Sequence, residues 1–136
     1  MPTRRARGRR GGRVGTADTG PGGGVELPAI VVVLVTGPDE ETLLGIGRRL
    51  VAERLAACCN VLGGVASVYR WKDEIEQEGE ALAIIKTTRA CLEPLEGAVR
   101  SLHPYEEPEF LVLPILGGSE GYLSWVAGSV QAAGED

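Results

Sequence analysis

Residues 29–41 read AIVVVLVTGPDEE, an apolar run followed by glycine, proline and three acids. The run is strand-sized and rich in β-branched side chains, which suits a central strand covered on at least one face. Proline fits the first turn of a helix, and carboxylates complement its positive end, so a helix start is expected next. Leu43, Ile46 and Leu50 then recur at spacings of three and four, as on one face of an amphipathic helix. The fold is therefore predicted to begin with a strand and a helix.

The chain continues with further strand and helix patterns. Residues 56–71 are rich in strand formers and are interrupted by Gly63-Gly64, which favours a bend or a β-bulge. The acidic segment Lys72–Glu80 is expected to connect this strand to an apolar strand at 81–88, as a hairpin. The remaining predicted elements are a helix marked by Leu92, Leu95, Val99 and Leu102 with Pro94 in its first turn, a strand at 109–115 in which Pro114 indicates the end or an unpaired edge, and a short terminal helix marked by Tyr122, Trp125, Val126 and Val130.

This order of elements predicts an α+β protein: a ferredoxin-like βαββαβ sandwich with an antiparallel sheet and a short C-terminal helix. Both main helices cover one face of such a sheet, and the other face is left uncovered. The abundance of Val, Ile and Leu favours another subunit as its cover. The architecture hosts many unrelated functions, so it does not identify an activity.

The 136 residues carry 14 basic and 19 acidic side chains, distributed unevenly. Residues 1–24 contain six arginines, eight glycines and one acid, so residues 1–27 are expected to be a disordered tail and residues 28–132 one folded domain. The acidic domain should not bind nucleic acid, because phosphate contacts need clustered positive charge. No apolar run reaches the roughly 18–20 residues that cross a bilayer. Three cysteines without a CxxC pair suit a reducing compartment, so a cytoplasmic protein is expected.

The single histidine lies in a loop with two prolines and several polar side chains. The sequence has no glycine-rich nucleotide loop and no serine-hydrolase motif, and one histidine is too few for metal sites that need two. Imidazole nitrogen and carboxylate oxygen are ligands for divalent transition metals, so His103 and Glu106 are the candidate metal ligands. The alternative is structural: His103 would favour the negative end of a helix, and a rigid polar turn would follow.

Two further patterns carry acidic or aromatic chemistry. In an extended segment Glu74, Glu76 and Glu78 would share one face, where a divalent cation would relieve their repulsion. The alternative is a solvated hairpin tip whose charges discourage edge pairing. Tyr69 and Trp71 point to the same side of a strand end, which indicates a pocket lining or a subunit contact, with core packing as the alternative.

Six blocks of the sequence resemble the CutA divalent-cation tolerance family in order and spacing. They are Val32–Thr36, Leu55–Val61, Ser67–Lys72, Ile85–Thr88, Leu102–Glu106 and Tyr122–Val126. The resemblance implies a ferredoxin-like subunit in a tight homotrimer, with an extended β-hairpin that reaches neighbouring chains. It also implies tolerance to divalent metals, copper especially, with copper binding in some members and no known reaction. Some copper-binding relatives carry cysteine and histidine where this chain has Val35 and Leu102, so His103 alone remains of that ligand set.

Two functions are consistent with these observations. The first is a trimeric cytosolic protein that binds divalent cations, such as Cu²⁺, through His103 and Glu106, without an organic cofactor or catalytic turnover. The second is a ligand-sensing or scaffolding trimer, similar to PII-type signalling proteins, with a small-molecule pocket between subunits. Trp71, Lys86, Tyr105 and Glu106 are expected to line that pocket, on their polar and aromatic chemistry and on the resemblance.

Overall fold

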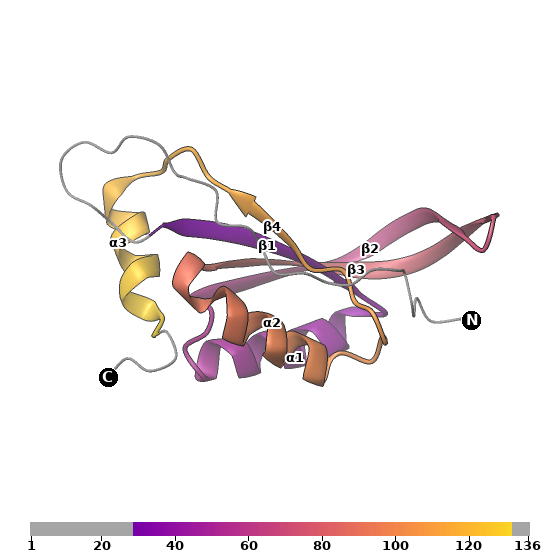
Figure 1. Cartoon of the computed structure of the whole chain (residues 1–136), viewed down its shortest axis with the longest axis horizontal. Helices are drawn as coiled ribbons and strands as arrows, with labels where there is room; N and C mark the ends of the chain where they lie inside the picture. The colour runs from indigo at the N-terminus through magenta and orange to yellow at the C-terminus, as the bar shows by residue number, and fades with distance from the viewer. Residues whose placement is uncertain (1–28, 132–136) are drawn as a thin grey trace.

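The predicted order of strands and helices is found in the computed structural model, which describes residues 29–131. Its elements are β1 (Ile30–Gly37), α1 (Glu40–Ala52), β2 (Cys58–Trp71), β3 (Glu74–Thr88), a 3-10 turn (Arg89–Cys91), α2 (Leu92–Leu102), β4 (Leu111–Pro114) and α3 (Glu120–Ser129). The strands pair antiparallel in the order β2-β3-β1-β4. Figure 1 shows α1 and α2 on the same side of this sheet. The ferredoxin-like α+β fold is thereby confirmed, whereas the predicted tail lies outside the described residues.

The hydrophobic core lies between the sheet and the helices α1 and α2. On β1, Val31, Val33 and Val35 point toward the helices and are almost fully buried. They meet Leu43 and Leu50 of α1, and α2 adds further aliphatic side chains. Each aliphatic side chain that is fully buried stabilises the fold by about 1.5–3 kcal/mol. None of the helices within residues 29–131 has the length and apolar character that a bilayer crossing needs.

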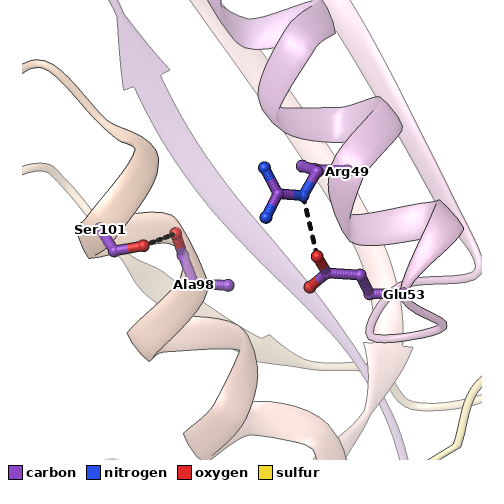
Figure 2. A network of polar contacts seen from close by, with 4 residues as sticks. All are labelled: Arg49, Glu53, Ala98 and Ser101. Carbon is purple, nitrogen blue, oxygen red and sulfur yellow. Dashed lines mark hydrogen bonds and ion pairs between the residues drawn. The ribbon is translucent and has the colours of Figure 1, made fainter.

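The first turns of both core helices are defined by local sequence. Asp39 is the N-cap of α1, since its carboxylate accepts the backbone N–H of Thr42 at 2.8 Å. This hydrogen bond lowers the pKa of Asp39. Proline at 38 precedes this cap and is therefore just outside the first turn, whereas Pro94 lies inside the first turn of α2, as predicted. Figure 2 shows the two helices side by side, with the Arg49–Glu53 ion pair on α1.

The prediction that Lys72–Glu80 only connects two strands is wrong. Lys72 and Asp73 alone form the turn, with φ of 52° and 67°, and β3 begins at Glu74. Positive φ at both central residues is typical of the two-residue hairpin turns whose twist matches that of the strands. The acidic stretch can be a strand because alternate side chains point to opposite faces, and tyrosine hydroxyls hydrogen-bond to two of the glutamates.

Gly63-Gly64 forms the predicted β-bulge. The pairing of β2 with β3 shifts between Leu62 and Val65, so two residues of β2 lie opposite one residue of β3. Gly64 has φ of 71°, which glycine adopts without a steric penalty. As a result, even-numbered residues before the bulge and odd-numbered residues after it lie on the same side of the sheet. Beyond the bulge, β2 and β3 continue as a two-stranded hairpin arm that projects from the sheet (Figure 1).

The face of the sheet opposite α1 and α2 carries an aliphatic surface. We call this the open-face patch; its residues are Leu34, Leu62, Leu82, Ile84 and Leu111, which occupy adjacent positions across the four strands. Leu62 is 47% exposed and Leu111 is 55% exposed. The patch agrees with the predicted uncovered face.

The C-terminal part of the fold differs slightly from prediction. The last strand is shorter than the predicted range 109–115, because Glu109 turns toward the end of β1, where it accepts the Thr36 hydroxyl at 3.5 Å. The short terminal helix is confirmed as α3, which packs at the end of the sheet through fully buried Val126 against Ile30 and Ala57.

Candidate functional site

His103 caps the C-terminal end of α2 and turns its ring into the protein. Its backbone N–H donates to the carbonyl of Val99 at 2.9 Å, and its side chain is buried. The ring Nε2 lies 2.7 Å from the carbonyl oxygen of Thr36, at the end of β1. The ring Nδ1 accepts the backbone N–H of Tyr105 at 3.1 Å. The imidazole therefore joins α2, β1 and the loop that leads to β4.

These contacts identify the tautomer of His103. Nδ1 accepts a hydrogen bond, so it carries no proton, and a carbonyl can only accept, so Nε2 must carry one. Both ring nitrogens are thus used by backbone groups. A metal ion could bind this ring only after one of the two hydrogen bonds breaks. The arrangement agrees with the structural alternative, a helix terminus followed by a rigid polar turn, and does not provide a free nitrogen ligand.

Two tyrosines, of which Tyr105 lies beside His103, each hydrogen-bond to a buried glutamate of β3. The Tyr105 hydroxyl donates to Glu80 Oε2 at 2.7 Å, and the Tyr69 hydroxyl donates to Glu78. The rings of Tyr105 and His103 are in contact, with centroids 4.6 Å apart. We call Tyr69, Glu78, Glu80 and Tyr105 the tyrosine–glutamate cluster. It lies where the hairpin arm leaves the sheet and concentrates two carboxylates on one face of a strand.

The structure contains the acidic face that the glutamate spacing predicts for an extended segment. Glu74, Glu76 and Glu78 do share one side of β3, because the segment is extended. Glu106, the second candidate metal ligand, is exposed in the loop after α2. Among residues 29–131, however, no three side chains of His, Cys, Asp or Glu come together as a metal site. The carboxylates described in one protomer are therefore scattered, and both nitrogens of the imidazole already form hydrogen bonds. These residues do not form a preorganised copper site within a single subunit.

The residues expected to line a small-molecule pocket are far apart in one protomer. Trp71 lies at the tip of the hairpin arm opposite Glu74, and Lys72 stacks its ammonium 5.6 Å from the Trp71 ring centroid. Lys86 is twelve residues further along β3, about 40 Å away at about 3.3 Å per residue. Tyr105 contacts Glu80, roughly midway between them. A pocket containing Trp71 and Lys86 together would need more than one subunit.

Sequence reasoning missed the partners that hold His103 and Tyr105. Thr36 and Glu80 are 67 and 25 residues away from their respective partners in sequence. The alternation of glutamates along 74–80 was the available signal for Glu78 and Glu80, because it continues to Glu80 at the same period. Nothing in the sequence pattern indicated the Thr36 carbonyl, since any residue supplies a carbonyl oxygen.

Comparisons with known proteins agree with this geometry. The profile of the family "CutA1 divalent ion tolerance protein" matches residues 31–129. The divalent-cation tolerance protein CutA of Salmonella newport (strain SL254) is 43% identical over 107 residues, covering 79% of this chain and 93% of that protein. The solved divalent cation tolerance protein (Cut A1) from Thermus thermophilus superposes with a TM-score of 0.74 at 42% identity, over 75% of this chain and 99% of that one.

A more distant solved relative is the periplasmic divalent cation tolerance protein CutA from Archaeoglobus fulgidus. It has a TM-score of 0.72 at 28% identity, over 75% of this chain and 99% of that chain. The family profile and the Salmonella relative each span most of the folded part of this sequence. This chain belongs to the CutA1 family of divalent ion tolerance proteins.

Proposed function

We propose that this protein is a cytoplasmic homotrimer that binds divalent cations, copper among them, without catalytic turnover. The observation that carries the proposal is family membership, because its relatives are named for divalent-cation tolerance. The acidic excess of the chain, 19 Asp and Glu against 14 Lys and Arg, favours cations over anions as ligands.

The open-face patch supports the trimer. Each of its aliphatic side chains that becomes fully buried between subunits would contribute up to about 1.5–3 kcal/mol. Both outer strands of the sheet, β2 and β4, also present unpaired backbone groups at an edge. When one surface of a subunit binds a different surface of the next subunit, the contacts are head to tail. Such contacts form a closed ring if the rotation between neighbouring subunits returns to the first one.

The assembly is tested by one charge on the patch. Leu111 is exposed in the protomer, so Leu111→Asp should leave the subunit fold intact and dissociate the trimer. Leu44→Asp is the matched control, because Leu44 is 41% exposed on α1, on the other side of the sheet. Sedimentation velocity should give a protomer for Leu111→Asp and a trimer for Leu44→Asp. A wild-type protein that sediments as a single chain would contradict the proposal.

The cation would be held by carboxylates from more than one subunit. Within residues 29–131 of one protomer no three-ligand group exists, and His103 has no free nitrogen, whereas Glu106 is exposed beside the tyrosine–glutamate cluster. Carboxylate oxygens suit hard divalent cations and also bind Cu²⁺. Assembly and cation binding are thereby linked.

Calorimetric titration with Cu²⁺ tests this link. The trimer should show saturable binding, Glu106→Gln should weaken it, and dissociated Leu111→Asp should lose it. Binding that is equally strong in Leu111→Asp would contradict a site shared between subunits. Absence of saturable binding in the wild type would remove the metal role altogether.

The hairpin arm favours a second function, a ligand-sensing or scaffolding trimer. The arm extends beyond the sheet (Figure 1), so its tip with Trp71 can reach a neighbouring subunit, where it would meet Lys86 or Tyr105. Thermal-shift screening of small metabolites distinguishes this function, because a ligand that binds the native trimer raises its melting temperature. A stabilising metabolite whose effect is lost in Trp71→Ala would support it over the cation function.

The cytoplasmic assignment relies on the thiols. All three cysteines of the described residues are free, which is the usual state in a reducing compartment. The relative from Archaeoglobus fulgidus is described as periplasmic, so the compartment needs a direct test. Fractionation of cells that express the full chain should place it with cytoplasmic markers; release with the periplasmic fraction would contradict the assignment.

A further inference from the structure

The three cysteines of this protein lie in three different environments. Cys91 is completely buried, at the start of α2. Cys59 faces the core, where its sulfur lies close to Gly47 of α1, and burial raises the pKa of its thiol to about 11. Cys58, its neighbour in β2, points to the opposite side of the sheet and is partly exposed. Cys58 and Cys59 are thus both partly exposed, on opposite faces of the sheet, and Cys58 has a primary amine beside its sulfur.

Cys58 faces a cluster of polar groups from three elements. It lies directly opposite Lys86 in the β2–β3 pairing, and the Lys86 Nζ is 4.0 Å from the Cys58 Sγ. The thiol donates to Asn60 Oδ1 at 3.5 Å, and the Lys86 ammonium donates to the same oxygen. The side chain of Tyr122 on α3 interacts with the same thiol. This cluster is next to α3, at the opposite end of β3 from the hairpin tip.

A thiol and a primary amine at this separation can become covalently joined after oxidation. Strand pairing holds the two backbones in register, so only side-chain torsions must change for Nζ to reach Sγ. The thiolate is the form of a cysteine that reacts with a peroxide. Sulfenic acids are known to condense with nearby nitrogen to give an S–N bond. Cys59 and Cys91, by contrast, pack into the protein interior.

We propose that Cys58 and Lys86 form an oxidation-induced cross-link between β2 and β3. In the first step the Cys58 thiolate attacks hydrogen peroxide, an S–O bond forms as the O–O bond breaks, and the departing hydroxide takes a proton from the Lys86 ammonium and leaves as water. In the second step the neutral Lys86 amine attacks the sulfur of the sulfenic acid, an S–N bond forms, and the hydroxyl leaves with an amine proton as a second water. Sulfur loses two electrons overall and the peroxide gains them. The bridge removes the positive charge of Lys86 and ties the start of β2, an edge strand, to β3.

Peptide mapping of the peroxide-treated full chain tests the cross-link. The reaction is run in mildly alkaline buffer, because the thiolate and the neutral amine are the forms that react. Trypsin does not cleave after a modified lysine, so the expected product joins the peptide 55–70 to the peptide 73–89, with two hydrogen atoms fewer than the two peptides together. A second hydrogen peroxide can insert one oxygen atom between the sulfur and the nitrogen, with loss of water. A joined peptide that is heavier by one oxygen therefore also supports the bridge. Dithiothreitol should reverse either product and restore cleavage after Lys86.

Matched variants decide the assignment. Lys86→Arg keeps the positive charge and should abolish the joined peptide, as should Cys58→Ser, while Cys59→Ser should still form it. Circular dichroism checks that each variant is folded. The proposal is overturned if the joined peptide persists in Lys86→Arg, if Cys59 is oxidised as fast as Cys58, or if Cys58 proceeds to sulfinic acid with Lys86 still cleaved by trypsin.

Discussion

The structure predicts that replacing His103 destabilises the protein even when no metal is present. His103→Ala removes a hydrogen bond from each of two backbone groups: the carbonyl of Thr36, 2.7 Å from Nε2, and the N–H of Tyr105, 3.1 Å from Nδ1. Each buried group left unsatisfied costs about 1–3 kcal/mol, and water that enters the space will recover part of this. We expect the free energy of unfolding to fall by about 3 kcal/mol.

Guanidinium unfolding followed by circular dichroism measures this change. Wild type and variant must be compared at equal protomer concentration and with a chelator present, because assembly and bound ions both add to apparent stability. Glu106→Ala is the control, since this exposed residue in the same loop should change stability by less than about 0.5 kcal/mol. Nitrogen NMR of the imidazole should also show a proton on Nε2 and none on Nδ1. Equal stabilities of wild type and His103→Ala, or a difference seen only with added metal, would refute a structural role.

Three further predictions concern the arm, the first helix and a core thiol. Asp73→Gly should raise stability by about 0.5–1 kcal/mol in thermal melts, because Asp73 has φ of 67°. On α1, Gly45→Ala should stabilise by up to about 1 kcal/mol because nothing lies within 4 Å of the new Cβ, whereas Gly47→Ala should destabilise because its Cβ would be 2.8 Å from the Cys59 sulfur. The pKa of Cys59 is raised from 9.0 to about 11, so its thiol ionises more readily in the unfolded chain. Stability should therefore fall as pH rises from 9 through 11, more steeply in the wild type than in Cys59→Ala.

Much of the fold could be predicted because its core elements carry local patterns. The β-branched run of β1 and the three-and-four spacing of α1 each identify an element without reference to the rest of the chain. The acidic strand could not be predicted in the same way. Its stability depends on hydroxyl donors that arrive from β2 and from the loop after α2, and propensity scales do not include such partners.

The sequence indicates which residues belong to the candidate site, but it does not indicate how their side chains are arranged in space. His103 was identified as the notable residue of its loop, yet the direction of its ring depends on the end of β1, 67 residues earlier. The separation of Trp71 and Lys86 depends on where the hairpin turns. The sequence pattern predicts a connection over Lys72–Glu80, whereas the turn consists of Lys72 and Asp73 alone. A two-residue turn lengthens both strands and moves the tip away from the sheet.

The single extra residue at the Gly63-Gly64 bulge sets the orientation of the whole hairpin arm. In a regular strand one residue more or fewer exchanges inward and outward positions for everything that follows, but a bulge absorbs the extra residue by placing two residues opposite one. Deleting Gly64 would leave Gly63 alone opposite residue 81, so Val65 would still pair with Glu80 and the phenol of Tyr69 would stay on the side of Glu78. The same one-codon loss at Ala66, between the bulge and the turn, would instead bring Val68 and Arg70 to the side of the glutamates and send the phenol of Tyr69 away from them.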